Sequence, residues 1–262
     1  MYKFTFVILH YLTIDDTIEC VESILEKIDY PDYKIIIVDN ASPNKTGEKL
    51  STLYKDNLKI TVIINSENLG FAKGNNVGFK YAKERLNSNF IALINNDTII
   101  EDADFISIVL KKYEISKFDV LGPDVVSLAD KKHQNPRELT IKSKARLIKL
   151  IRHHRFLLGL NYFMIDSITE KLKKKFFPKP FISNSSDKYL NYSTDQTNVK
   201  LSGCCLIFSQ DYIKRSNGLF PETFLFSEEE ILYYICKRDN LRILYSPDTS
   251  IIHKEDSTLN AL

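Results

Sequence analysis

The sequence has few glycines, prolines and cysteines, and this scarcity excludes several classes of protein. With 8 Gly, 8 Pro and 4 Cys among 262 residues, the chain is neither collagen-like nor a disulfide scaffold, and its 44% hydrophobic content excludes a disordered chain. The cysteines also lack the CxxC spacing of zinc and redox sites, so we expect all of them to be reduced and structural. They are Cys20, Cys204, Cys205 and Cys236.

Long apolar runs and an excess of one charge are absent as well. The longest candidate, 156–165, is interrupted by Gly159 and Asn161 and is far shorter than the roughly 20 residues that cross a bilayer. The first residues lack the cleavage site of a signal peptide, which predicts a cytoplasmic protein. Because 36 Lys+Arg nearly balance 34 Asp+Glu, the total charge indicates no nucleic-acid partner.

The first half of the chain alternates β-rich apolar runs with helical patterns. Parallel strands need a crossover between them, and a helix supplies it, so this alternation predicts an α/β fold with a mostly parallel central sheet and helices on both faces. The predicted strands are 4–9, 34–38, 60–64 and 90–94, and the predicted helices are 15–28, 45–54 and 72–85. After Val126 the rhythm breaks, and it resumes with strands 201–208, 242–245 and 250–253 and helices 209–215 and 227–238.

Polar residues follow each of the first four predicted strands. They are His10-Tyr11, Asp39 to Ser42, Asn65 to Asn68, and Asn95 to Asp97. Ligands of such sheets bind at the carboxyl ends of the strands, so these residues predict a site along one edge. The alternative is that Asn and Asp only terminate turns there.

Glycines at positions 70, 74 and 78 have the spacing G-x3-G-x3-G. This is neither the dinucleotide-binding fingerprint nor a P-loop, so hydride transfer and Walker-type hydrolysis lose support. The segment predicts a flexible strand-to-helix turn whose backbone N–H groups could bind an anion such as diphosphate. A helix that merely starts glycine-rich is the alternative.

Four acidic or imidazole side chains are candidates for chemistry. Asp97, beside amide oxygens, suits Mg²⁺ or Mn²⁺, although an Asx turn explains the same cluster, and His253 could be a further ligand or an incidental surface residue. Glu228 and Glu229 repel each other, which raises the pKa of a carboxyl group toward that of a general base. Alternatively, Ser227 and Glu230 form a capping box that starts a helix.

Six motifs occur in one order along the chain. They are Val7 to Tyr11, Ile36 to Ser42, Asn68 to Asn76, Leu93 to Thr98, Gly203 to Cys205, and Phe224 to Glu229. Together they resemble the inverting family 2 glycosyltransferases of the GT-A fold, in particular the rhamnosyltransferase-like branch of bacterial polysaccharide assembly. The resemblance covers residues 4–126 and 200–257.

The resemblance implies a role for each matching position. Asp39 would contact the base of a nucleoside-diphosphate sugar, Asp97 and His253 would bind the divalent metal, Mg²⁺ or Mn²⁺, and Glu229, beside Glu228, would be the catalytic base. The residues expected around the UDP- or dTDP-sugar are His10, Tyr11, Asp39, Asn68, Gly70, Phe71, Gly74, Asn75, Asn95 and Asn96. Two positions depart from the family pattern, since Asn95 replaces the first Asp of a DxD motif and Ile231 stands where many members carry Asp.

The implied activity is that of an inverting hexosyltransferase acting on a glycan or lipid-linked acceptor. We expect a single domain with a nucleotide-sugar half at 1–126, a basic insertion at 127–198 and an acceptor half at 199–262. Within the insertion, 142–179 mixes cations with apolar residues, as in a helix on an anionic membrane surface, so the protein could be peripheral at the inner face of the cell membrane.

Two other functions compete with this interpretation. One is a catalytically silent nucleotide-sugar or polyanion-binding module, in which the glutamates only cap a helix and the basic segment does the binding. The other is a nucleotidyltransferase. The sequence disfavours the second, because His10-Tyr11-Leu12-Thr13 stands where a Gly-rich basic loop would follow the first strand.

Overall fold

The computed structural model describes residues 1–139, 145, 147–149, 151–152, 155 and 190–255. The chain divides into two compact units, Met1–Arg137 with Asn191–Leu262, and Glu138–Leu190. The predicted membrane-binding segment 142–179 lies largely outside the described residues. No helix among those described is long and apolar enough to cross a membrane. All the predicted site residues belong to the first unit.

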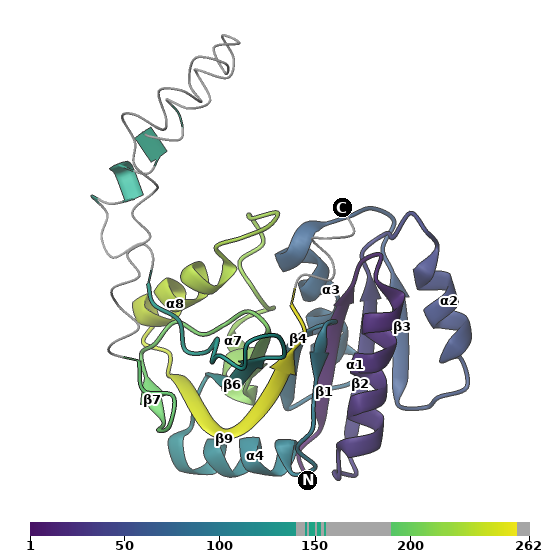
Figure 1. The fold of residues 1–262 in the computed structure, drawn as a ribbon, viewed down its shortest axis with the longest axis horizontal. Coiled ribbons are helices and arrows are strands. Elements are labelled where there is room, and N and C mark those ends of the chain that lie inside the picture. Colours follow the sequence, from purple (N-terminus) through teal and green to yellow (C-terminus); the bar gives the residue numbers. More distant parts are fainter. Residues whose placement is uncertain (140–144, 146, 150, 153–154, 156–189, 256–262) are drawn as a thin grey trace. The chain divides into compact units, whose positions relative to one another are not determined.

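A single sheet forms the centre of the first unit (Figure 1). Its strands run in the order β3-β2-β1-β4-β8-β6-β9-β5, with β7 pairing to β9. Strands β1, β2, β3 and β4 are mutually parallel, β6 is parallel to β9, and β5, β7 and β8 are antiparallel to their neighbours. The predicted mostly parallel α/β sheet is therefore confirmed. The strands are β1 Phe4–His10, β2 Tyr33–Asp39, β3 Ile60–Ile64, β4 Phe90–Asn95, β5 Thr98–Ile99, β6 Val120–Ser127, β7 Gln196–Thr197, β8 Cys205–Phe208 and β9 Ile243–His253.

Helices cover both faces of this sheet. They are α1 Ile14–Lys27, α2 Thr46–Leu53, α3 Gly70–Glu84, α4 Phe105–Ser116, α7 Gln210–Arg215 and α8 Glu228–Arg238. Strand β1 shows why two layers are needed, because Phe6 on one side packs with Val21 and Phe105 in the main core. On the other side, a Cβ on Gly78 of α3 would come within 2.4 Å of Val7. A strand buried on both faces reads as a continuous apolar run, as these strands do.

Three expectations about local structure differ from the fold. The strands predicted at 242–245 and 250–253 are one strand, β9, whose pairing with β6 shifts register after Pro123. Strand β8 begins only at Cys205, four residues later than predicted. The capping box is absent, since Ser227 has a left-handed backbone with φ 73° and makes no side-chain cap hydrogen bond.

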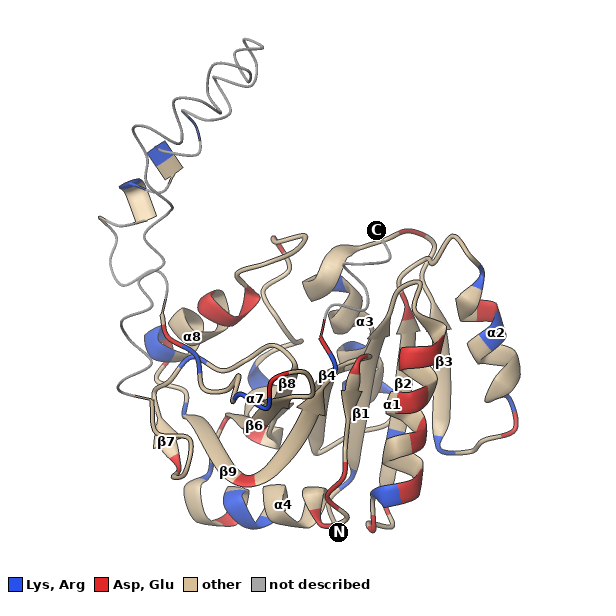
Figure 2. Ribbon diagram, viewed as in Figure 1, with Lys and Arg blue, Asp and Glu red and all other residues tan. Residues whose placement is uncertain are grey.

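Glu230 pairs instead with Lys200, at 3.3 Å between Oε1 and Nζ. The alternative that assigned the acidic run to helix capping is therefore wrong for the Ser227 and Glu230 pair. Glu228 and Glu229 still occupy the first turn of α8, where negative charge is favoured by the helix dipole. Figure 2 shows the acidic residues gathered at this end of α8.

Candidate active site

The carboxyl ends of β1, β2 and β4 lie side by side. In the parallel pairing, His10 stands opposite Asp39, and Leu9 stands opposite Asn95. The polar residues that follow these strands therefore share one edge of the sheet, as expected from their positions in the sequence.

His10 is fully buried, and hydrogen bonds occupy both of its ring nitrogens. Nδ1 lies 2.7 Å from the Thr17 hydroxyl and Nε2 lies 2.7 Å from the Thr46 hydroxyl. Because Thr46 already donates its proton to Asn44, His10 donates to the Thr46 hydroxyl from Nε2. Burial lowers the pKa of His10 and so favours the neutral imidazole. The Asp39 carboxylate, 3.7 Å away, opposes this shift but does not outweigh it.

Asp39 is only 1% exposed at the end of β2. Its Oδ2 accepts a hydrogen bond from the Ser42 amide at 3.2 Å, whereas its Oδ1 has no hydrogen-bond partner among the described residues. Gly47 of α2 leaves the space that this carboxylate fills, since a Cβ there would lie 2.5 Å from Oδ2. A buried carboxylate oxygen without a donor is costly unless a ligand supplies one.

The glycine-rich turn is held by amide side chains. Asn40 donates from Nδ2 to Asn68 Oδ1 at 2.8 Å and accepts the Leu69 amide at 3.0 Å. Asn68 Oδ1 in turn accepts the Gly70 amide at 2.9 Å, and the Phe71 amide donates to the Phe224 carbonyl at 2.7 Å. The first two amides of α3 are thus bonded within the protein, so the expected free N–H groups for a diphosphate are not present at these two positions.

The other glycines and Asn75 of this helix serve packing. A Cβ on Gly74 would lie 2.7 Å from Leu9, and Asn75, buried, donates to the Phe71 carbonyl at 3.0 Å. Gly70 is different, because its φ of +77° favours glycine. A Cβ at this position would also lie only 2.2 Å from the Phe224 carbonyl oxygen, so only glycine fits here. Gly70 therefore fixes the contact between this turn and the segment before α8.

Asn95 and Asn96 also bind the protein itself. The backbone N–H of Asn95 donates to the Cys204 carbonyl at 2.9 Å. The buried Asn96 side chain donates from Nδ2 to the hydroxyls of Thr13, at 2.8 Å, and Thr17, at 3.0 Å. Asn96 thereby joins the β4 end to the His10 network. Tyr11 is half-buried just after β1.

Buried Asp97 and partly buried His253 form a pair. Strand β5 pairs with β9 so that Thr98 stands opposite His253, and His253 Nε2 lies 3.4 Å from Asp97 Oδ1. Burial lowers the pKa of His253, but the neighbouring Asp97 carboxylate and the contact with Cys204 outweigh it and raise that pKa to about 10.

The same pair fits a divalent cation. Two ligands at about 2.1 Å from a metal and at right angles to each other are about 3 Å apart, close to the observed separation. No cluster of three His, Cys, Asp or Glu side chains is found among the described residues, so further ligands would have to be substrate or water oxygens. Mg²⁺ and Mn²⁺ accept such mixed oxygen sets.

Glu229 is connected to this pair through the segment that precedes β8. A Cβ on Gly203 would lie 2.8 Å from Glu229 Oε1, so the carboxylate rests against the backbone at Gly203. The next residue, Cys204, has its Sγ atom 3.6 Å from His253 Nδ1. Glu229 and the Asp97–His253 pair therefore border the same short segment, although they are far apart in the sequence.

Glu228 is the more buried of the two neighbouring acids. Burial raises the pKa of Glu228, and the charge of Glu229 adds to the rise. Glu229 is half-buried and so remains accessible to an acceptor. The structure thus separates a buried acid from an accessible one, which favours Glu229 for proton transfer to or from a substrate.

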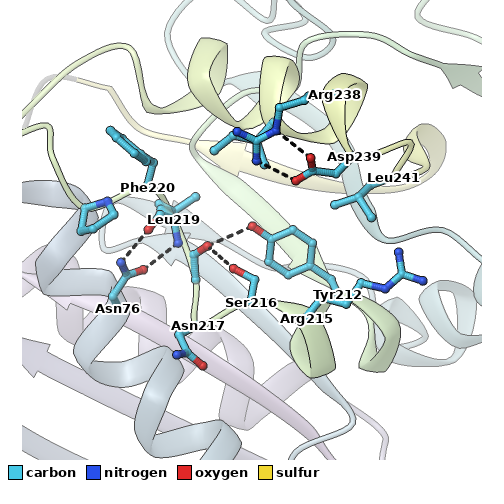
Figure 3. Close-up of a pocket in the computed structure, with 13 residues that line it drawn as sticks. Asn76, Tyr212, Arg215, Ser216, Asn217, Leu219, Phe220, Arg238, Asp239 and Leu241 are labelled. Carbon is cyan, nitrogen blue, oxygen red and sulfur yellow. Dashed lines mark hydrogen bonds and ion pairs between the residues drawn. The ribbon is translucent and has the colours of Figure 1, made fainter.

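A cavity of about 580 Å³ lies elsewhere in the first unit, between α7 and the C-terminal half of α8 (Figure 3). Leu219 and Asn76 hold its wall through two hydrogen bonds of 2.7 Å, and Arg238 is paired with Asp239 at 2.6 Å. None of the site residues predicted from the sequence lines this cavity. It is therefore separate from the strand-end site.

Sequence reasoning did not identify three residues that shape the site. Gly47 makes room for Asp39, Gly203 makes room for Glu229, and the Gln134 side chain accepts a hydrogen bond from His253 Nδ1 at 2.8 Å. Gly203 was part of a recognised motif, but without a role. Gln134 carried no sequence signal, because its partner is 119 residues away.

Comparison with known proteins agrees with this architecture. The family model described as glycosyl transferase family 2 matches residues 5–215. Solved structures of TarS from S. aureus are similar in fold: TarS 1–349 with UDP-GlcNAc has a TM-score of 0.59 at 16% identity over 99% of this chain, and TarS 1–349 with UDP has 0.57 at 18% over 96%. A longer TarS structure has a TM-score of 0.57 at 17% identity over 96% of this chain.

The chain spans 60–61% of TarS 1–349 and 36% of the longer TarS structure. A comparison with curated proteins finds no match.

The central sheet, its helical layers and these neighbours define the GT-A fold, as the sequence predicted. Since the family model covers most of the chain, the protein belongs to glycosyl transferase family 2. The rhamnosyltransferase-like branch stays a prediction.

Proposed function

We propose that the protein transfers a sugar from a nucleoside-diphosphate sugar to a hydroxyl group of a glycan or lipid-linked acceptor, with inversion at the anomeric carbon. One observation carries this proposal. The accessible Glu229 and the Asp97–His253 pair both border the Gly203–Cys204 segment, which supports a common site for the proposed base and the proposed metal ligands.

Asp39 is the proposed contact to the nucleotide base. Its Oδ1 is buried without a donor, and the uracil and thymine rings both carry an N–H group that could supply one. This chemistry supports UDP or dTDP, and TarS, with its UDP and UDP-GlcNAc complexes, supports UDP. His10 acts as a positioning residue, because its ring nitrogens are committed to Thr17 and Thr46.

Asp97 and His253 would hold the divalent metal. When bound, the cation would supply positive charge that stabilises the leaving diphosphate, and oxygens of the diphosphate would serve as further ligands. Asn95 in place of the first Asp of the motif leaves one carboxylate for this task. We therefore expect metal affinity to depend on the presence of nucleoside diphosphate.

Glu229 is the proposed base of a single displacement. It accepts the proton of an acceptor hydroxyl, the oxygen forms a bond to the anomeric carbon of the donor, and the bond to the diphosphate oxygen breaks on the opposite face. Configuration inverts as a result. A positioned base contributes about 10² to 10⁴ in rate, and alignment and charge stabilisation supply the remainder.

The acceptor is proposed to be a glycan or a lipid-linked sugar, in line with the basic segment 142–179. Eleven Lys+Arg and two acids in that segment give it a positive charge that anionic lipid attracts. Flotation with anionic liposomes at low and high salt tests this part, because electrostatic binding weakens as salt rises. No binding at low salt would refute it.

Nucleoside diphosphate release tests the activity itself. The purified protein is incubated with UDP-GlcNAc, UDP-glucose and a dTDP-sugar, with and without Mn²⁺, and we expect one donor to be consumed slowly even without an acceptor. Thermal shift with UDP and dTDP measures binding independently, since a ligand of the native state raises its stability. Binding without any turnover, with or without glycan acceptors, would favour the catalytically silent module.

A further inference from the structure

We infer that Gln134 is a positioning residue that orients His253, so that the Nε2 atom of the imidazole faces Asp97 and the metal. The inference rests on the metal-binding role proposed above for the Asp97–His253 pair. Gln134 lies in the segment after β6, outside every motif of the sequence and outside both the donor-binding and the base positions.

The direction of each hydrogen bond around Gln134 can be deduced. Gln134 Nε2 donates to Glu255 Oε1, and an ionised carboxylate can only accept, so the amide nitrogen must face Glu255. The amide oxygen of Gln134 then faces His253 Nδ1, 2.8 Å away. Since this oxygen can only accept, His253 must carry a proton on Nδ1.

A metal binds the neutral imidazole, which carries one proton, so a proton kept on Nδ1 leaves the lone pair on Nε2 for the metal. Nε2 is the nitrogen that lies 3.4 Å from Asp97 Oδ1, on the side where a shared cation would bind. A proton fixed on Nε2 would occupy that position and exclude the metal. In metal sites the partner of the second ring nitrogen commonly sets the tautomer in this way.

Backbone contacts hold Gln134 in this place. The backbone N–H of Gln134 donates to the Val125 carbonyl of β6 at 2.7 Å. The neighbouring Asn135 is fully buried, and its side-chain oxygen accepts from the backbone N–H of Ser202 at 2.9 Å. The segment is thus tied both to the sheet and to the stretch that leads to Gly203. Cys204 Sγ also approaches His253 Nδ1, but at 3.6 Å and as a weaker acceptor than an amide oxygen.

The test compares Mn²⁺ binding by the wild-type protein and by Gln134→Leu in the presence of UDP. Electron paramagnetic resonance measures the dissociation constant, and electron spin-echo modulation detects whether a histidine nitrogen is coordinated. We expect Gln134→Leu to weaken Mn²⁺ binding by about 10- to 100-fold and to lose or reduce the nitrogen signal. Gln210→Leu is the matched control, because the Gln210 side chain donates to the Tyr113 hydroxyl near the amino end of β4, away from the proposed metal site.

A double variant separates the proposed role from a general loss of structure. In Gln134→Glu with Glu255→Gln, a carboxylate oxygen still accepts from His253 Nδ1 and the amide donor now comes from position 255. We expect this pair to bring the Mn²⁺ dissociation constant back to within about 3-fold of the wild type and to restore the nitrogen signal, as an equivalent acceptor at position 134 should.

Equal Mn²⁺ affinity and an unchanged nitrogen signal in Gln134→Leu would overturn the inference while leaving the metal site intact. Absence of Mn²⁺ binding by the wild type would instead end the metal assignment of Asp97 and His253, and the role of Gln134 with it. Transfer of sugar is scored separately by donor consumption.

Discussion

The site has two parts whose backbone is held in different ways: the segments around His10, Asn40 and Gly70, here called the donor edge after the proposed function, and the segment from Phe224 to Glu229, here called the catalytic edge. At the donor edge, Leu12 and Ala41 have positive φ, at 67° and 60°, and side chains hold this backbone, since the Leu12 amide donates to Ser42 Oγ at 3.0 Å and the Leu12 carbonyl accepts from Asn44 Nδ2 at 2.9 Å. At the catalytic edge, Phe226 and Ser227 both have positive φ, at 72° and 73°, which costs about 1–3 kcal/mol each for residues other than glycine. Both edges therefore contain backbone with positive φ, but side-chain hydrogen bonds hold it at the donor edge, whereas Ser227 at the catalytic edge makes no side-chain cap hydrogen bond.

The strain is held in place by the donor edge. The Phe71 amide of the glycine turn donates to the Phe224 carbonyl, and the Ile231 amide closes the first turn of α8 on the Ser227 carbonyl at 3.0 Å. Phe224 and Phe226 remain 63% and 66% exposed, so burial of these side chains does not compensate for the strain. The difference between the two edges predicts different consequences for substitutions in each.

The largest effect is expected at the catalytic edge, from Glu229→Gln. The amide cannot accept the acceptor proton, so we expect kcat to fall at least about 10²-fold while the donor dissociation constant stays unchanged. Donor consumption kinetics and isothermal titration calorimetry measure the two quantities. Glu222→Gln on the same segment, exposed, is the control, and a Glu229→Gln enzyme with full turnover would remove the base from this position.

Adding one methyl group at either edge sharpens the comparison. In Gly203→Ala the new Cβ lies 2.8 Å from Glu229 Oε1, and in Gly47→Ala it lies 2.5 Å from Asp39 Oδ2. Because small displacements of reacting groups are costly, we expect about a 10-fold loss of kcat in the first and about a 10-fold rise of the donor KM in the second. Steady-state kinetics with varied donor would show the split, and the same change in both variants would contradict separate roles.

Ser227→Gly tests the strain at the catalytic edge directly. Glycine adopts positive φ without penalty and Ser227 loses no cap hydrogen bond, so we expect the free energy of unfolding to rise by about 1 kcal/mol. Ser209→Gly is the matched control, because Ser209 starts α7 with an extended backbone at φ −79° and gains nothing from glycine. Urea unfolding compares the two, and a destabilised Ser227→Gly variant would argue against stored strain.

The smallest effect concerns Glu228 and pH. The raised pKa of Glu228 means that the folded protein keeps this proton at a pH where the unfolded chain has released it. Stability from this group is therefore present below the ordinary carboxyl pKa and is lost as pH rises through the folded value. Glu228→Gln should make the free energy of unfolding less dependent on pH over that interval, as urea titrations can show. A slope identical to that of Glu222→Gln would contradict the buried state of Glu228.

Much of the fold follows from local patterns, and the failures have physical causes. Strands buried on both faces, such as Phe4–His10 and Ile35 to Val38, stand out as apolar runs, and α1 shows a regular apolar face. Helix α4 was not predicted, and neither was β6, where Gly122 and Pro123 interrupt the β pattern and stability comes from pairing with β8 and β9. These pairings join segments that are distant in the sequence.

The site was predictable where topology alone decides it. Parallel strands bring His10, Asp39 and Asn95 to one edge, and the family resemblance named Asp97, His253 and Glu229. The sequence could not show that His10, Asn75 and Asn96 bond the protein itself, nor that Ser227 turns left-handed. These outcomes depend on which side chain reaches which backbone group across the fold, and no local pattern encodes that.

The most direct test of the central claim is the proximity of Glu229 to the metal-binding pair. A fluorinated thiol tag is placed at position 229 in Glu229→Cys and at position 84, on the opposite edge of the sheet, in Glu84→Cys; all four native cysteines are free but buried. With UDP and Mn²⁺ bound, we expect the ¹⁹F resonance at position 229 to broaden strongly and that at position 84 to stay sharp. A sharp resonance at position 229 with Mn²⁺ bound would contradict a shared site for base and metal.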